Sequence, residues 1–123
     1  MRVGVFVVGI GAVLACGNPA ALNTGHSTQI VATDFEFAPD SDTVAALQNI
    51  TFQFPSTDTA THNVTWINAP PGATASGDRR PGSTPYTVYV GQPGTYVYYC
   101  RFHGNPGPNG TAVGMAGVLV VTP

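Results

Sequence analysis

The sequence predicts an all-β fold, a Greek-key β-sandwich of about seven or eight short strands in a single domain. Glycine (15) and proline (11) are abundant, valine, threonine and tyrosine are common, and long runs of helix-forming residues are missing. Several short stretches alternate apolar and polar side chains, which is the period of a half-buried strand. Clusters of turn-forming residues separate these stretches. With 123 residues, the chain has room for one modest hydrophobic core.

The predicted strands follow one another at short intervals after residue 28. Residues 30–37 alternate two carboxylates with two phenylalanines and are expected to form the first half-buried strand. Pro55 ends a later strand because proline cannot donate a hydrogen bond to a sheet. Residues 69–83 form the longest irregular stretch and are expected to connect the two sheets at the surface. The other strands are predicted over residues 43–47, 50–54, 62–67, 85–90, 95–100 and 117–121.

The N-terminus predicts export. Residues 1–15 carry one positive charge followed by an apolar run, which is too short to span a bilayer, where about 20 residues are needed. The run ends in residues 13–17 (VLACG), which resemble a bacterial lipobox and imply cleavage before Cys16 and lipid attachment to its sulfur. Simple export with cleavage nearby is the alternative. Residues 16–28 lack periodicity and are expected to be a flexible tether.

The charges are few and exclude some classes of partner. Four arginines and no lysines stand against six acidic residues, giving a net charge of −2. Such a surface gives no electrostatic reason to bind nucleic acid. The expected location is the periplasm or the outer face of the cell membrane.

Four side chains form the donor set of a mononuclear type 1 copper site. Cys100 and His103 are three residues apart, Met115 precedes the last predicted strand, and His62 lies upstream. A His2Cys plane with a weak thioether donor suits both Cu(II) and Cu(I), so we expect one copper ion here. A disulfide between Cys16 and Cys100 is the alternative for an exported chain. Cys100 as an inert buried thiol, beside two ordinary core histidines, would require three coincidences.

Three segments are similar to the signature segments of the cupredoxins, especially the plastocyanin, amicyanin and halocyanin branch. They are residues 61–64 (THNV), 94–103 (GTYVYYCRFH) and 115–118 (MAGV). The resemblance covers most of the chain from residue 29 onward. It implies a copper-binding domain over residues 29–123, with His62, Cys100 and His103 as equatorial ligands and Met115 as the axial ligand. It also implies no enzyme activity, because the copper would be fully ligated.

One departure from that family affects the axial ligand. The interval from His103 to Met115 is longer than in plastocyanins, so the extra residues are expected to loop out and return. Methionine also fills ordinary cores. If Met115 does only that, the amide of Asn105 or Asn109, or the Thr61 carbonyl, is the axial candidate.

The resemblance also suggests roles for neighbouring residues. Asn63 is expected to tie the two ligand segments together, the alternative being a strand-edge side chain in solvent. Tyr99 is a candidate second electron route beside His103, or it packs on the opposite face. The His103 edge is expected at the surface, where redox proteins dock transiently. The apolar patch around it is expected to contain Pro106, Pro108, Ala112 and Val113.

The expected function is that of an exported, lipid-anchored, monomeric carrier that shuttles one electron at a time between redox partners. The alternative is a periplasmic copper chaperone or storage protein, which the absence of Met-rich or His-rich tracts disfavours. A copper-free adhesive sandwich is a third candidate. A copper oxidase or nitrite reductase needs further copper sites, and His26 is the only other histidine.

Overall fold

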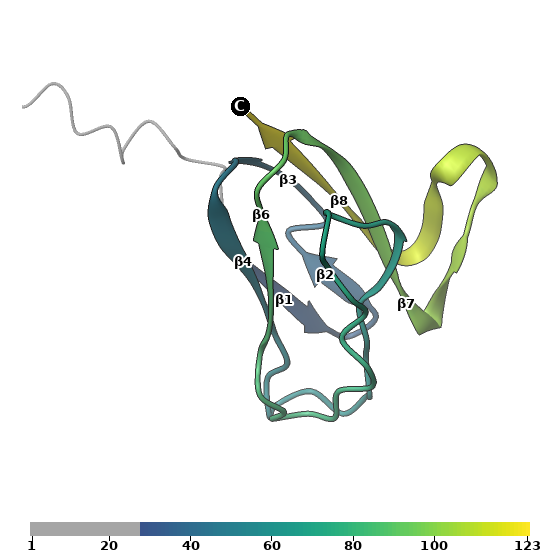
Figure 1. Ribbon diagram of the computed structural model, residues 1–123. Helices are drawn as coiled ribbons and strands as arrows, with labels where there is room; N and C mark the ends of the chain where they lie inside the picture. Colours follow the sequence, from purple (N-terminus) through teal and green to yellow (C-terminus); the bar gives the residue numbers. More distant parts are fainter. Residues whose placement is uncertain (1–27) are drawn as a thin grey trace, which may run out of the picture.

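The computed structural model describes residues 28–123, which form two facing four-stranded sheets (Figure 1). One sheet has the order β2-β1-β4-β6 and the other β3-β8-β7-β5. The predicted β-sandwich of about seven or eight strands is confirmed, with eight strands present in the described residues. The strands are β1 (Gln29–Thr33), β2 (Glu36–Ala38), β3 (Ser41–Ala45), β4 (Gln48–Gln53), β5 (Thr65–Asn68), β6 (Tyr86–Val90), β7 (Gly94–Pro106) and β8 (Ala112–Thr122).

The N-terminal predictions lie outside the described residues. They concern the leader over residues 1–15, the tether up to residue 27, lipid attachment at Cys16 and the spare His26. Within residues 28–123, no helix is both long and apolar enough to cross a membrane.

The chain crosses repeatedly between the two sheets. From β3 through β7, each strand lies in the sheet opposite to that of its predecessor. Two of the pairings are parallel, β1 with β4 and β3 with β8, and the others are antiparallel. Because each crossing connection joins the edges of two layers, the inner faces enclose a single core.

The first predicted strand is in fact two strands. Asp34 and Phe35 have φ angles of 43° and 68°, and the chain reverses there so that β2 pairs antiparallel with β1. The alternation of polar and apolar residues runs unbroken through this turn because two turn residues preserve a period of two. Periodicity alone therefore could not reveal the reversal. A phenylalanine in the left-handed region is uncommon, and its conformation costs about 1–3 kcal/mol.

Aromatic side chains form the centre of the core. Tyr98, on β7, is fully buried and meets three rings edge-on. The ring centroids lie 5.0 Å from Phe37, 5.1 Å from Phe52 and 5.3 Å from Trp66. Edge-to-face contacts of this kind add to the free energy gained by burying the rings.

The Tyr98 hydroxyl has no hydrogen-bond partner among the described residues, so we expect Tyr98→Phe to stabilise the fold. Burial raises the pKa of Tyr98 well above its usual range, and the charges of Asp40 and Asp42 act in the same direction. Because an unpaired buried hydroxyl costs about 1–3 kcal/mol, its removal should raise the free energy of unfolding by about 1 kcal/mol in urea titrations.

Tyr86→Phe is the matched control for this prediction. The Tyr86 hydroxyl donates to the Thr74 carbonyl and accepts from the Trp66 indole at 3.1 Å. Its removal should lower the free energy of unfolding by about 1 kcal/mol. Equal losses from the two substitutions would show that Tyr98 has a partner after all.

The β7–β8 hairpin contains the irregularity that shapes the functional end. Tyr99 pairs with Ala116, but the next pairing is Gly104 with Gly114, so residues 100–103 lie opposite the single residue Met115. A Cβ on Gly104 would lie 2.6 Å from the Met115 carbonyl oxygen, so only glycine fits where the strands rejoin. The bulge therefore gathers the residues of the sequence motif around Met115.

The segment after His103 is not the loop that its composition suggests. Residues 104–106 and 112–114 pair as a two-stranded ribbon that turns through η2 (Pro108–Gly110). This ribbon, residues 104–114, projects from the sandwich (Figure 1). Glycine and proline favoured an irregular loop, but in a ribbon with open edges these residues interrupt few ladder hydrogen bonds.

Candidate metal centre

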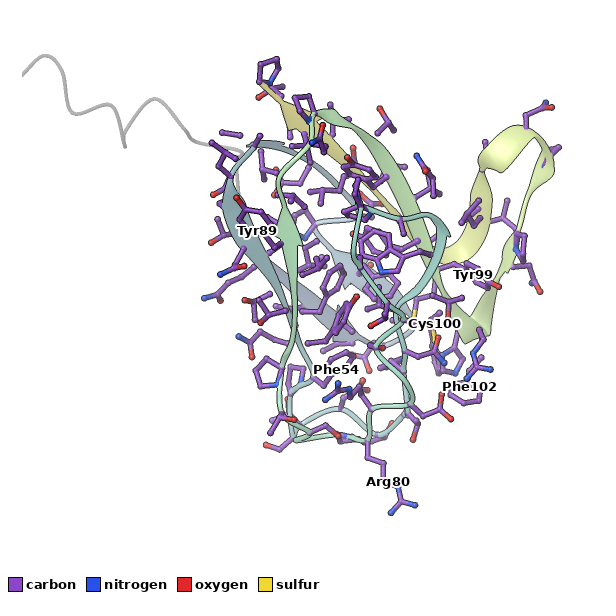
Figure 2. The ribbon with its side chains drawn as sticks, viewed as in Figure 1. Phe54, Arg80, Tyr89, Tyr99, Cys100 and Phe102 are labelled. Carbon is purple, nitrogen blue, oxygen red and sulfur yellow. The ribbon has the colours of Figure 1, made fainter. Side chains whose placement is uncertain are left out.

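Three of the predicted ligands converge at one end of the sandwich. His62 precedes β5, whereas Cys100 and His103 lie in the bulge of β7. Their donor atoms all lie within 4.8 Å of one another. The Cys100 Sγ atom is 3.9 Å from the His62 Nδ1 atom and 3.7 Å from the His103 Nδ1 atom. Figure 2 shows Cys100 and Phe102 at the end where the ribbon leaves the body.

These separations fit a metal ion better than they fit hydrogen bonds. Metal–sulfur and metal–nitrogen bonds of about 2.3 and 2.05 Å, at 120° in a trigonal plane, place sulfur and nitrogen roughly 3.8 Å apart. The observed 3.9 and 3.7 Å bracket that value. A His2Cys plane of this shape is the equatorial set of type 1 copper sites. The residues therefore fit one type 1 copper ion.

Met115 completes the set from β8. Its side chain is 1% exposed, and the strand register places it against the bulge that carries Cys100 and His103. The alternative donors Asn105 and Asn109 are exposed on the projecting ribbon. The arrangement His62–Cys100–His103–Met115 therefore has the composition of a type 1 site.

His62 is held from behind by a residue that the sequence analysis did not single out. Its Nε2 atom donates to the Asp58 carboxylate at 2.5 Å, and both side chains are almost completely buried. Burial raises the pKa of Asp58, but hydrogen bonds from the Thr59 and Ala60 N–H groups and from His62 outweigh it and hold this pKa below its usual range. An aspartate in a polar loop is usually solvated, so the sequence carried no signal for this contact.

The loop over residues 69–83 supports the same ligand. The His62 N–H donates to the Arg79 carbonyl at 3.0 Å, and the Arg79 N–H donates back to the His62 carbonyl at 2.7 Å. The Arg79 guanidinium donates to the carbonyl oxygens of Ser76 and Thr84. These hydrogen bonds hold the irregular segment against the main chain at His62.

Asn63 bridges the two ligand segments. Its Oδ1 atom accepts the Arg101 backbone N–H at 2.9 Å, next to Cys100. Its Nδ2 atom donates to Asp78 at 3.1 Å, and Asp78 also pairs with the Arg101 guanidinium at 2.9 Å. The buried amide therefore fixes the segment after His62 to the bulge that carries Cys100.

His103 lies at the boundary between core and solvent. Phe35 meets its ring edge-on with centroids 4.4 Å apart, and the His62 ring lies 5.1 Å away. Burial and the neighbouring His62 lower the pKa of His103, whereas the charge of Asp58 opposes this. Phe35 is 59% exposed and Phe102 is 52% exposed, so two aromatic side chains flank the histidine at the surface. Phe35 was assigned to a strand from the sequence, which offered no reason to place it here.

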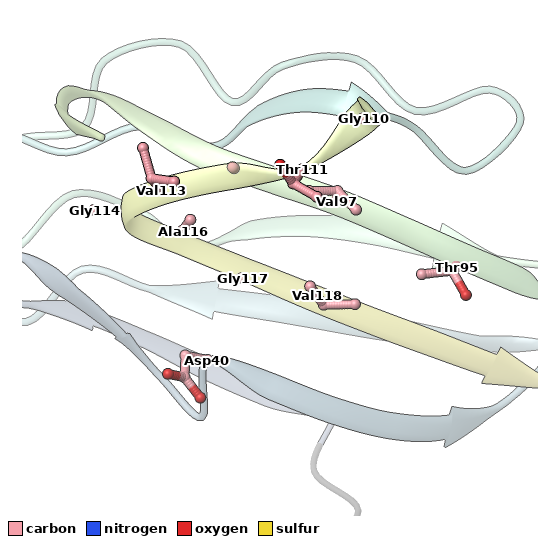
Figure 3. A pocket seen from close by; sticks show the side chains of 11 residues that line it. Asp40, Thr95, Val97, Gly110, Thr111, Val113, Gly114, Ala116, Gly117 and Val118 are labelled. Atoms are coloured by element: carbon pink, nitrogen blue, oxygen red, sulfur yellow. The ribbon is translucent and has the colours of Figure 1, made fainter. Parts of the chain in front are cut away.

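Two surface hollows border this end. One, of about 650 Å³, is lined by Thr61, Asp78, Arg80, Phe102 and His103. The other, of about 580 Å³, lies between the ribbon and the outer face of the β7–β8 pair, with Val97, Val113 and Val118 among its lining residues (Figure 3). Tyr99 is half-buried and points away from the face that bears Cys100.

Comparisons with known proteins agree on the fold. No family model matches the sequence, and no curated protein matches it. A solved structure of an amicyanin mutant in its reduced state is 21% identical, covers 76% of this chain and 80% of its own, and has a TM-score of 0.58. Oxidised plastocyanin from Dryopteris crassirhizoma is 25% identical over 76% of this chain and 99% of its own, with a TM-score of 0.55.

A third solved structure is a purple cupredoxin from Nitrosopumilus maritimus. It is 18% identical, covers 78% of this chain and 100% of its own, and has a TM-score of 0.57. The three solved structures cover between 76% and 78% of this chain, so the likeness in fold extends over most of the sandwich. This chain has the cupredoxin fold, with the residues of a type 1 copper centre at one end of the sandwich.

Proposed function

We propose that the protein is an exported one-electron carrier whose type 1 copper is held by His62, Cys100 and His103, with Met115 as the axial ligand. The observation that carries the proposal is the spacing of the three donors, which matches a trigonal metal plane. When bound, copper supplies a Cu(II)/Cu(I) couple that changes charge with little change in shape.

The four proposed ligands differ in their exposure to solvent. Cys100, His62 and Met115 are buried and keep water from the donor atoms. Among the four proposed ligands, His103 alone is only partly buried, so its ring offers a path from the centre to the surface. No coordination position remains for a substrate, which supports a carrier over an enzyme. Tyr99, beside the ligand cysteine, is a candidate second route.

The docking surface for a redox partner is proposed around His103. Phe35 and Phe102 are exposed on either side of its ring, and Val113 is exposed on the adjoining ribbon. This composition differs from the expected patch, which included Pro106, Pro108 and Ala112 but neither phenylalanine. A small apolar contact suits partners that bind weakly and dissociate quickly.

An absorption and EPR spectrum after addition of Cu(II) tests the proposed function. An intense thiolate-to-copper charge-transfer band is expected, with reversible reduction by ascorbate and reoxidation without loss of metal. A spectrum of weak ligand-field bands alone would reject the type 1 site. Release of copper to a weak chelator on reduction would instead favour the chaperone or storage alternative.

Met115→Leu tests the axial ligand. Leucine has a similar volume but no sulfur, so the blue colour should persist while the reduction potential rises. Loss of the weak donor removes electron density that favours Cu(II). Cyclic voltammetry of the two proteins checks this, and an unchanged potential would show that Met115 is not axial. Leu119→Met, a buried change elsewhere on β8, is the control.

Cys16→Ala tests the anchor. The resemblance of residues 13–17 to a lipobox supports attachment of a lipid to Cys16. Without it, the domain is expected to move from the membrane fraction to the soluble periplasmic or culture fraction, as detected by immunoblot. Continued retention in the membrane would reject the lipid anchor, and the copper spectrum should be the same in both proteins.

A further inference from the structure

A buried carboxylate lies behind the proposed copper ligand His62. The side chain of Asp58 is 2% exposed and that of His62 is 1% exposed, and the Nε2 and Oδ2 atoms are 2.5 Å apart. We propose that Asp58 is a positioning residue that aims the Nδ1 atom of His62 at the Cys100 sulfur and adds a fixed negative charge that favours the oxidised centre. This inference rests on the proposed function, since it concerns the same site.

The hydrogen bond to Asp58 explains the orientation of the His62 ring. The two nitrogens of an imidazole point in different directions, so a bond at Nε2 fixes where Nδ1 points. An ionised carboxylate can only accept, so it places the proton on Nε2 and leaves the lone pair on Nδ1. That lone pair faces Cys100 Sγ at 3.9 Å. The histidine is therefore held in the tautomer that binds a metal.

Asp58 is itself held in place before any metal binds. Its Oδ1 atom accepts the Thr59 N–H at 2.7 Å and the Ala60 N–H at 3.4 Å, while Oδ2 receives His62. The main chain of His62 is fixed separately by the two backbone bonds with Arg79. Both partners are therefore preorganised, and little ordering remains to be done on metal binding.

The charge of Asp58 has no other ion-pair partner among the described residues. The Arg101 guanidinium pairs with Asp78, and that of Arg79 donates to carbonyl oxygens and the Thr84 hydroxyl. With a thiolate and this carboxylate, the centre would have a net charge of 0 with Cu(II) and −1 with Cu(I). A buried net charge is unfavourable, so the carboxylate should stabilise the oxidised form relative to the reduced form.

The two proposed histidine ligands are held by different kinds of contact. His103 is flanked by the rings of Phe35 and Phe102, and no carboxylate contacts it within residues 28–123. One histidine is therefore fixed by charge and burial, and the other by aromatic contacts at the surface. The buried carboxylate therefore acts on the centre from the His62 side.

The test is Asp58→Asn in the full copper-loaded protein, which keeps the shape and removes the charge. The ratio of oxidised to reduced protein at a fixed potential is expected to fall about tenfold to hundredfold, a rise of about 59 to 118 mV for one electron. Affinity for Cu(II) should fall about 10- to 100-fold, as is typical when a partner of a metal-binding histidine is lost.

Two controls separate this role from a general loss of structure. Glu36→Gln removes an exposed carboxylate on β2 that has no contact with the ligands, and the ratio of oxidised to reduced protein should change less than twofold, roughly 18 mV in potential. Asp58→Glu keeps the charge and should keep the potential close to that of the wild type. A shift below about 18 mV in Asp58→Asn, or equal shifts in all three variants, would overturn the proposal.

A metal-free readout keeps the inference independent of the copper assignment. Nitrogen-15 NMR of the apo protein should show His62 as a single tautomer protonated at Nε2, and Asp58→Asn should give a mixture or a different tautomer. The same tautomer in both proteins would overturn the positioning role. Failure of the wild-type protein to form a blue centre, with His62 still fixed by Asp58, would instead reject the proposed function.

Discussion

Cys100→Ser is expected to abolish the intense thiolate-to-copper absorption. It should also weaken Cu(II) binding by more than about 100-fold, which is the upper end of the loss seen when a hydrogen-bond partner of a metal ligand is removed. Cys100 is fully buried, and its sulfur lies 3.9 and 3.7 Å from the two histidine Nδ1 atoms. A serine hydroxyl does not ionise as readily as a thiol and is a hard donor, so it cannot replace the sulfur in a soft site. Visible absorption and a competitive copper titration measure the two effects.

The fold should survive this substitution, which makes the result interpretable. Serine matches cysteine in shape. The free energy of unfolding of the apo protein should fall by no more than about 3 kcal/mol, which is the cost of a buried hydroxyl without a hydrogen-bond partner. Cys16 is the only other cysteine in the sequence. A blue colour that persists in Cys100→Ser but disappears in Cys16→Ala would place the thiolate ligand in the N-terminal segment and reject the proposed centre.

Gly117→Ala is expected to be the most destabilising single change in the strands around the core. Gly117 lies on β8 opposite Tyr98, and a Cβ added there would lie 2.3 Å from the Tyr98 ring. The ring cannot move away because Phe37, Phe52 and Trp66 surround it. Overpacking of this kind costs about 1–3 kcal/mol and more where the neighbours are rigid. Urea unfolding of the metal-free protein measures the loss.

A double-mutant cycle identifies the cause of that loss. Tyr98→Leu removes the ring that the added methyl group would strike, so Gly117→Ala should cost much less in that background. The expected coupling is about 1–3 kcal/mol, as for residues in direct contact. Additive effects of the two substitutions would show that Gly117 is needed for a reason other than the contact with Tyr98.

The strands were predictable because each has a local pattern, and the pairing was not because it depends on distant segments. Alternation located β4, β6 and the first half of β7 correctly to within a few residues. The reversal at Asp34 and Phe35 left the alternation intact, so it was invisible. The ribbon over residues 104–114 escaped detection because its glycines and prolines are typical of loops, whereas its pairing is an extension of β7 and β8.

The donor set was predictable from residue types and spacing, but its surroundings were not. Cys100 and His103 lie close in sequence, and Met115 precedes a recognisable strand. Asp58 and Phe35 act on the two histidines through contacts that no spacing rule expresses. Asp58 belongs to a polar loop and Phe35 to a turn, so each depends on how the loops cross at the end of the sandwich.

The direction of β1 has a consequence for how the molecule would be presented at a membrane. Phe35, just after β1, touches His103, so Thr28 lies at the far end of the sandwich, roughly 20 Å along the strand. A molecule moored through its N-terminal side, as proposed, would thus carry the end that bears His103 away from the mooring. Donor and acceptor proteins would then reach that end from the side opposite to the bilayer.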